Sequence, residues 1–417
     1  MAFGSTPVLL WLFFLSLSPL TKAKVPAIIV FGDSSVDSGN NNLISTVLKS
    51  NFQPYGRDFY GGQPTGRFCN GRIPPDFISE AFGLKPAIPA YLDPAYNISD
   101  FATGVCFASA GTGYDNATSK VLNVIPLWKE LEYYKEYQRK LRSYVGENKA
   151  NEILREALYL MSLGTNDFLE NYYVFPTRKS QFSVRQYQDF LLGLGENFAR
   201  ELHALGVRKI SITGLPPMGC LPLERATNIL GQNDCVPEYN NVASGFNRKL
   251  EGLVAKLNKE LPGMRMVSAP AYDIFYQIIT RPSLFGFEVT GVACCSAGTF
   301  EMSYLCNQYN PFTCSDASKY SRKEDGKGAG TLVQLVTTKG SNNTVDPFTS
   351  AKLGTLPAKA KLIYGQTTEL FTPALTALSA STFSSLEVCL VSQLWPRQHL
   401  QQETSMLLKI VGALVGY

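Results

Sequence analysis

The chain has 417 residues, of which 45% are hydrophobic, and its formal net charge is only +4. This length and composition indicate a globular protein whose core is built in one large domain or two smaller ones. The small and dispersed charge argues against nucleic acid or an anionic membrane surface as the main partner.

The N-terminus has the pattern of a secretory signal peptide. Residues 8–20 form an uncharged apolar run that is too short to span a membrane. Small residues around Ala23 then provide a cleavage site. We therefore assign residues 1–23 to a signal peptide, and we expect a secreted, extracellular protein without a transmembrane segment.

Secretion makes the nine cysteines disulfide candidates, because the extracellular compartment is oxidising. Cys220 and Cys235 bracket a loop rich in Pro, Gly and Asn, which indicates a local bridge. Four further candidates lie close together, and their connectivity stays open: Cys294, Cys295, Cys306 and Cys314. Zinc is the alternative ligand for this group, but no histidine lies near it.

Three N-x-Ser/Thr sequons agree with export, since such sites are glycosylated in the secretory pathway. They begin at Asn97, Asn116 and Asn342. We expect all three asparagines to be glycosylation sites.

The first expected element after the signal peptide is a buried strand over residues 25–30. It leads into Gly32-Asp33-Ser34, where Gly and Asp favour a sharp turn that exposes the serine hydroxyl. Gly-Asp-Ser is also an ordinary turn sequence, so this tripeptide alone does not assign a nucleophile.

The rest of the chain alternates between short apolar runs and long amphipathic segments. Further strands are predicted at residues 104–109, 157–163, 208–214 and 264–268. Helices are predicted at residues 75–83, 125–144, 184–205 and 238–261. In the second helix we interpret the apolar and aromatic stripe, Trp128 included, as core. Strands that alternate with helices predict a parallel sheet covered on both faces, with reactive groups at the carboxyl ends of the strands.

Three residues share a position relative to this sheet. Ser34, Gly111 and Asn166 each follow the carboxyl end of a predicted parallel strand. In one cleft, Ser34 would be the nucleophile, while the Gly111 amide and the Asn166 side chain would donate to a developing oxyanion. Taken singly, Gly111 is also a plain turn glycine and Asn166 a plain loop cap.

With these motifs the sequence resembles the plant GDSL esterase/lipases of the SGNH hydrolase superfamily, from about Val25 to about Tyr320. The resemblance is carried by residues 31–41 (FGDSSVDSGNN), 104–113 (GVCFASAGTG), 162–167 (SLGTND) and 214–220 (GLPPMGC), and by the cysteines after Ala293. It implies a three-layer α/β/α, flavodoxin-like fold with a mostly parallel five-stranded sheet. It further implies Ser34 as nucleophile and an oxyanion hole made by the Ser34 amide, Gly111 and Asn166. The implied reaction is hydrolysis of a small-molecule or lipid ester, without a metal or organic cofactor.

One departure from the family pattern concerns the acid and base of the catalytic triad. In the family, the stretch seen here at residues 315–320 leads into a Phe-Trp-Asp-x-x-His-Pro block that supplies both residues. Here Tyr320 is followed by unrelated sequence, and no Asp-x-x-His occurs in the chain. The two histidines are His203, inside a predicted helix, and His399, far from every family motif. The triad Asp and His are therefore not found.

These observations divide the chain into a signal peptide, a GDSL domain over residues 24–320 that lacks its usual C-terminal segment, and a divergent, weakly ordered tail over residues 321–417. We expect an ester hydrolase whose activity is impaired. Two alternatives stay open. One is a catalytically inactive member that binds acyl or glycan ligands. The other is a product of mis-splicing or of a misplaced gene boundary, whose last segment is foreign to the family.

Overall fold

The computed structural model describes residues 25–285, 287, 288, 290 and 291. Within them, five parallel strands form one sheet in the order β2-β1-β3-β4-β5. The strands are β1 (Ile28–Gly32), β2 (Gly104–Cys106), β3 (Leu158–Ser162), β4 (Lys209–Thr213) and β5 (Arg265–Ala269). The predicted α/β fold with a five-stranded sheet flanked by helices is confirmed.

The strand order places a topological switch between β1 and β3. After β1 the chain turns to β2 on one side, and it then crosses over to β3 on the other side. Gly32 pairs with Ser162, and Ser162 pairs with Thr213, so β1, β3 and β4 end at one level. Loops that leave such ends in opposite directions open the crevice in which α/β proteins bind their ligands.

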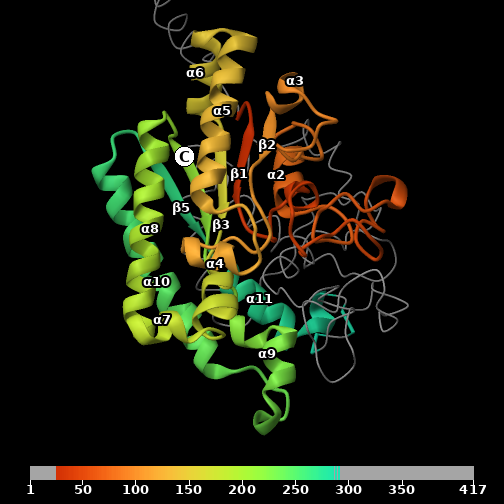
Figure 1. Cartoon of the computed structure of the whole chain (residues 1–417), viewed down its shortest axis with the longest axis vertical. Coiled ribbons are helices and arrows are strands. Elements are labelled where there is room, and N and C mark those ends of the chain that lie inside the picture. Colours follow the sequence, from red (N-terminus) through yellow and green to blue (C-terminus); the bar gives the residue numbers. More distant parts are fainter. Residues whose placement is uncertain (1–24, 286, 289, 292–417) are drawn as a thin grey trace, which may run out of the picture.

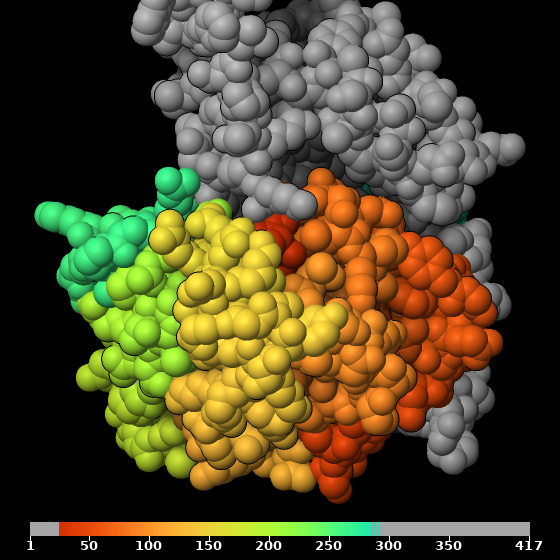
Figure 2. Space-filling model, turned by 90° about the horizontal axis from the view of Figure 1, so that it is seen from above, coloured from red at the N-terminus to blue at the C-terminus, as the bar shows by residue number. Residues whose placement is uncertain are grey.

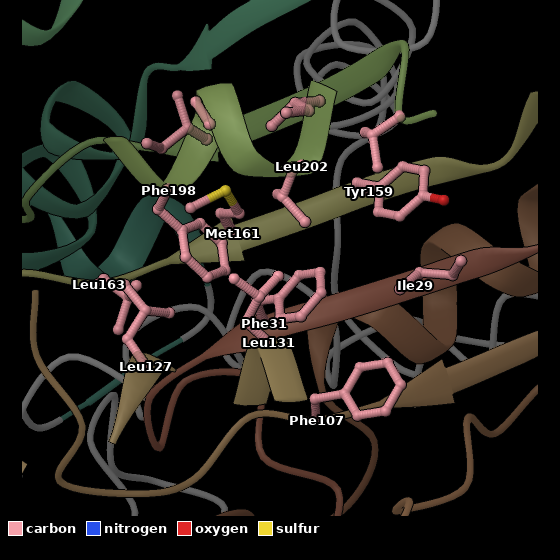
Figure 3. Packing of buried hydrophobic residues seen from close by; sticks show 14 of the residues in the cluster. Ile29, Phe31, Phe107, Leu127, Leu131, Tyr159, Met161, Leu163, Phe198 and Leu202 are labelled. Atoms are coloured by element: carbon pink, nitrogen blue, oxygen red, sulfur yellow. The ribbon is translucent and has the colours of Figure 1, made fainter. Parts of the chain in front are cut away.

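One face of the sheet carries most of the core. It is covered by α5 (Leu127–Val145), α6 (Glu147–Glu156), α8 (Val184–Ala204) and α10 (Pro237–Glu260). Ile29 and Phe31 point to this face because side chains alternate along a strand. The Phe31 ring lies 5.4 Å from the rings of both Phe107 and Phe198. Figure 3 labels the three residues within this core. These contacts fix β1, and with it the segment that follows β1.

The other face of the sheet has a smaller described core. Ile28 and Val30 point there and pack with Ile78 of α2 (Pro74–Ala81). A separate apolar cluster joins α11 (Ala271–Thr280) to the loop that follows β4.

Short helices gather at the carboxyl end of the sheet, at the bottom of Figure 1. They are α4 (Asn116–Val121), the π-helical η3 (Asp167–Tyr172), α7 (Pro176–Gln181) and α9 (Pro222–Thr227). The remaining short elements are η1 (Asn40–Leu43), η2 (Tyr60–Gly62), α3 (Ile98–Phe101), η4 (Met218–Cys220), η5 (Ile229–Gly231) and η6 (Pro282–Phe285). Figure 2 looks onto the opposite end, where the yellow segment of α5 and α6 lies between the orange and green parts of the chain.

The interpretation of Trp128 as core is wrong. Its side chain is 56% exposed and donates from Nε1 to Asn116 Oδ1 on α4. The buried stripe of α5 instead includes Leu127, Leu131 and Tyr134. Trp128 follows Leu127 by one residue, about 100° around the helix, and therefore points away from that stripe. Nor did the sequence pattern predict the separate helices α6 and α11.

Candidate active site

The segment after β1 is a tight turn built around Asp33. The Asp33 amide donates to the Ser162 carbonyl at 3.0 Å, and the Asp33 carbonyl accepts from the amides of Val36 and Asp37. The Asp33 carboxylate lies 2.9 Å from the Ser35 amide and 2.6 Å from the Ser35 hydroxyl. This turn orders the backbone on both sides of Ser34.

Gly32 is required at the start of this turn. Its φ is +145°, and a Cβ there would lie 2.8 Å from Val36 Cγ2 and closer still to the Ser162 carbonyl oxygen. No L side chain fits such close backbone contact. The glycine thus lets β1 and β3 stay paired up to the residue that precedes the turn.

Ser34 lies two residues after the end of β1. Its side chain is buried, and its hydroxyl has no hydrogen-bond partner among the described residues. Its backbone amide likewise donates to no described group. The Gly111 amide is also without an acceptor in this part of the chain.

The loop of Gly111 is held against the Ser34 turn by side chains that follow Ser34. Asp37 Oδ2 accepts from the Ala110 amide at 3.1 Å, and Asn41 Nδ2 donates to the Ala110 carbonyl at 2.9 Å. Asn40 Nδ2 donates to the carbonyls of Cys106 and Ala108. Hydrogen bonds therefore hold both the amide and the carbonyl of Ala110, the residue before Gly111.

Gly111 itself has φ +87°, a left-handed conformation that strongly favours glycine. A Cβ at this position would lie 2.9 Å from Leu48 Cδ1. The positive φ lets the chain reverse after Ala110, and the absence of a Cβ leaves room for the side chains of Leu48 and Val124.

Asn166 joins the same group of loops from the end of β3. It is buried, and its Nδ2 donates to the Thr112 carbonyl at 2.9 Å. Only the amide nitrogen can donate to a carbonyl, so this bond fixes the orientation of the side chain. The second N–H of the amide stays available for another acceptor.

Asp167, the next residue, ties the loops together a second time. Its carboxylate accepts from the amides of Tyr114 and Asp115, at 2.8 and 3.0 Å, and from the Thr118 hydroxyl at 2.6 Å. The Cβ of an alanine at position 113 would clash with this carboxylate, lying 2.6 Å from its Cγ. Asp167 thus clamps the segment that contains Thr112, the acceptor for Asn166.

Four buried carboxyl groups surround these loops. Burial raises the pKa of Asp33 and of Asp37 to about 6 and that of Asp167 to about 7. Burial also raises the pKa of Glu130 well above its ordinary value, and the nearby Asp37 and Asp33 add to the shift. Glu130, on α5, accepts from the Gly32 amide at 3.0 Å.

Sequence reasoning missed the roles of Asp37, Glu130 and Asp167. One signal was present for Glu130: it stands three residues after Leu127, on the buried stripe of α5. Asp37 makes a local turn by accepting from the amides of Gly39 and Asn40. No spacing rule pointed to its bond with the Ala110 amide or to the bonds of Asp167, because those partners lie in a distant loop.

The raised pKa values predict a pH dependence of stability. The three aspartates hold their protons more tightly in the folded protein than in the unfolded chain, where their pKa is near 3.8. The free energy of unfolding should therefore fall as the pH rises from about 4 to about 7, by about 3 kcal/mol for a carboxyl whose pKa shifts from 3.8 to about 6. Urea unfolding at pH 5 and pH 8 measures the upper part of this fall, to which a carboxyl with a pKa of about 6 contributes about 1.4 kcal/mol. Higher stability at pH 8 than at pH 5 would contradict it.

No histidine lies near Ser34 in the described part of the chain. His203 is on α8, and its Nε2 lies 3.0 Å from the Pro262 carbonyl. The end of α8 leads into the start of β4, so His203 lies at the amino edge of the sheet, opposite to Ser34. His399 and the expected tail lie outside the described residues.

The other residues singled out from the sequence have the following positions. A disulfide joins Cys220 and Cys235, while Cys294, Cys295, Cys306 and Cys314 lie outside the described residues. Asn97 and Asn116 are exposed, and Asn342 lies outside the described residues, as do residues 1–23, which the sequence pattern assigns to a signal peptide. In the part that the structure describes, no group of His, Cys, Asp and Glu side chains could hold a metal ion. No helix in those same residues is both long and apolar enough to cross a bilayer.

A family model described as GDSL-like Lipase/Acylhydrolase matches residues 28–304, which include every loop described above. The chain belongs to this family. The GDSL esterase/lipase At2g04570 of Arabidopsis thaliana is 64% identical over 312 residues, which are 75% of this chain and 89% of the relative. The Arabidopsis GDSL esterase/lipase At2g42990 is 60% identical over 315 residues, covering 76% of this chain and 90% of the relative.

Membership in the GDSL family supports ester hydrolysis as the chemistry of this fold, with a small-molecule ester as substrate. The predicted resemblance to plant GDSL esterase/lipases is confirmed by these matches.

Proposed function

We propose that this GDSL family member is a secreted ester hydrolase that has a nucleophile and an oxyanion hole but lacks the triad base, so that its turnover is strongly impaired. The observation that carries the proposal is the Ser34 hydroxyl: it is buried and has no hydrogen-bond partner among the described residues. The chain contains only two histidines, and neither lies in an Asp-x-x-His block.

The nucleophilic step would proceed from Ser34. Its Oγ forms a bond to the carbonyl carbon of the ester, and the electrons of the C=O double bond move to the oxygen. The negative oxygen would accept hydrogen bonds from the amides of Ser34 and Gly111 and from Asn166 Nδ2. The unpaired state of both amides and the fixed orientation of Asn166 support these roles.

The attack by Ser34 also requires a group that accepts the hydroxyl proton. The serine hydroxyl must give up its proton as it attacks, and the leaving alcohol must receive one as the ester bond breaks. His203 cannot serve, because it lies at the opposite edge of the sheet. In a serine hydrolase the loss of the base lowers turnover by up to about 10⁶-fold. The oxyanion hole and substrate binding alone still give a rate about 10³–10⁴-fold above that of the uncatalysed reaction in water.

Hydrolysis of p-nitrophenyl butyrate by the purified protein and by a Ser34→Ala variant tests the proposal. We expect slow hydrolysis that exceeds the variant and is several orders of magnitude below the rate of a complete family member. Equal rates for the two proteins would contradict catalysis by Ser34 and would favour the non-catalytic, ligand-binding alternative. A wild-type rate as high as that of a complete member would contradict the impairment.

Secretion is supported by residues 1–23 and by the exposure of Asn97 and Asn116. Expressed in a eukaryotic secretory host, the protein should appear in the medium without residues 1–23. Removal of N-glycans should lower its mass, and each of Asn97→Gln and Asn116→Gln should remove one glycan. Retention in cells, or an unchanged mass after glycan removal, would contradict this part of the proposal.

We also propose that the family domain covers residues 24–320 and that residues 321–417 are a divergent segment. The family match to residues 28–304, and relatives that align with only about three quarters of the chain, support this division. Sequencing of the transcript across the Tyr320 codon tests whether the segment is genuine. A transcript that joins the Tyr320 codon to an Asp-x-x-His block would show that residues 321–417 are foreign.

A further inference from the structure

An apolar tip protrudes beside the carboxyl end of the sheet. It consists of residues 228–234, between α9 and α10, and it is the lowest part of the described chain in Figure 1. Its outermost side chains are aliphatic: Ile229 is 64% exposed and Leu230 is fully exposed. Single exposed apolar residues are common, but two adjacent aliphatic side chains at the end of a projection are a costly exposure unless something covers them.

The tip is not a loose loop, because its backbone is bonded to itself. The amides of residues 231–234 donate to carbonyls of Asn228, Ile229 and Gly231 at 3.0–3.1 Å. At its base, Asn228 Nδ2 donates to the Asp234 carbonyl. The Cys220–Cys235 disulfide and an Arg225 hydrogen bond to the Asn233 carbonyl tie the tip to α9 and η4. The backbone that carries Ile229 and Leu230 is therefore already ordered, and no further ordering of the chain is needed when these side chains contact a partner.

A second exposed apolar pair lies near the start of α10. Val174 and Phe175, which precede α7, are 60% and 40% exposed. The preceding residue, Tyr173, stacks on Tyr239 of α10 with a ring separation of 4.2 Å. Since α10 begins directly after the tip, both apolar pairs belong to the same end of the molecule as Ser34.

We propose that this tip inserts into a neutral lipid–water interface and docks the protein there. Three features favour lipid over a protein partner. The apolar side chains project from a protruding tip instead of forming a flat patch. The amides of residues 231–234, which follow the apolar pair, are bonded within the tip, and this lowers the cost of removing that part of the backbone from water. Asn228, Gln232 and Asn233, three residues of the tip, carry uncharged polar side chains. The charged residues closest in sequence to the apolar pair, Arg225 and Asp234, are of opposite sign, so the docking does not depend on anionic lipids.

This inference goes beyond the proposed hydrolysis, because docking requires no chemistry at Ser34. Docking through the tip would hold the crevice at the carboxyl end of the sheet against the surface of aggregated acyl lipids.

Tryptophan fluorescence with phosphatidylcholine vesicles tests the proposal, using the full-length protein with Ser34→Ala so that no lipid is consumed. Leu230→Trp places a probe at the tip. Tyr144→Trp is the matched control, since Tyr144 is 52% exposed on the last turn of α5, at the opposite end of the molecule. Both are compared with the protein that lacks the added tryptophan. Vesicles with brominated acyl chains should quench the fluorescence added by Leu230→Trp and leave the fluorescence added by Tyr144→Trp unchanged.

A double change, Ile229→Ser with Leu230→Ser, should lower vesicle partitioning by about 100-fold, at about tenfold for each aliphatic side chain removed from the interface. Tyr144→Ser should leave partitioning unchanged. Absent quenching at position 230, or equal quenching at positions 230 and 144, would overturn the proposal. Binding that requires anionic lipid and disappears in salt would overturn it as well. Absence of docking in a protein that still hydrolyses soluble esters would overturn this inference alone and leave the proposed function standing.

Discussion

Restoring the missing triad block should raise ester hydrolysis by about 10⁴-fold or more. The change replaces residues 321–417 with the C-terminal segment of a family member that carries Asp-x-x-His. A histidine within reach of Ser34 Oγ would accept the hydroxyl proton during attack and return it to the leaving alcohol. The kcat for p-nitrophenyl butyrate, compared between the native and the grafted chain, measures the gain.

Two controls make this experiment decisive. The grafted chain with its new histidine changed to alanine should return to the native rate, and the grafted chain with Ser34→Ala should lose the gain entirely. A graft that folds, as judged by its thermal unfolding, and yet shows no gain would contradict the account of Ser34 as a nucleophile without a base.

Asp167→Ala should lower the free energy of unfolding by about 3–6 kcal/mol, because three buried donors lose their acceptor at once. Removal of a buried carboxyl also removes its desolvation cost, which offsets only part of this loss. The variant should also lose the ordering of the Thr112 segment that orients Asn166. Urea unfolding at pH 5, below the raised pKa of about 7 of Asp167, measures the change in stability.

Asp93→Ala is the matched control for this substitution. The Asp93 carboxylate also accepts from a backbone amide, that of Ala95, but it does so in an exposed turn. We expect a loss of less than about 1 kcal/mol there, because water replaces the lost partner. Similar losses for Asp167→Ala and Asp93→Ala would show that the buried clamp does not stabilise the loops.

Much of the fold could be predicted because buried parallel strands leave a strong signal. The run before Ser34 and the run at 157–163 are apolar on both faces, and each corresponds to a strand within a few residues. The predicted strand at 104–109 was too long. β2 ends at Cys106, although Phe107 and Ser109 still donate to Val30 and Gly32 of β1 as the chain departs. The separate helix α6 escaped prediction because it follows α5 across a single glycine, Gly146.

The candidate site could be predicted only in part. Ser34, Gly111 and Asn166 follow strand ends, and strand ends can be located from the sequence. The bonds that fix their neighbours, such as those from Asp37 to the Ala110 amide and from Asp167 to the Tyr114 amide, join residues 73 and 53 positions apart. No local pattern encodes such a pairing, because a backbone amide has no residue-specific signature.

Fluorophosphonate labelling of the native protein, followed by intact-protein mass spectrometry, tests the central claim most directly. The reagent bonds to an activated serine oxygen, so its rate reports both the identity of the nucleophile and the presence of a base. The account predicts slow labelling of the native chain, confined to Ser34 and absent in Ser34→Ala, and fast labelling of the grafted chain. Labelling of the native chain as fast as that of the grafted chain, or labelling that persists in Ser34→Ala, would contradict it.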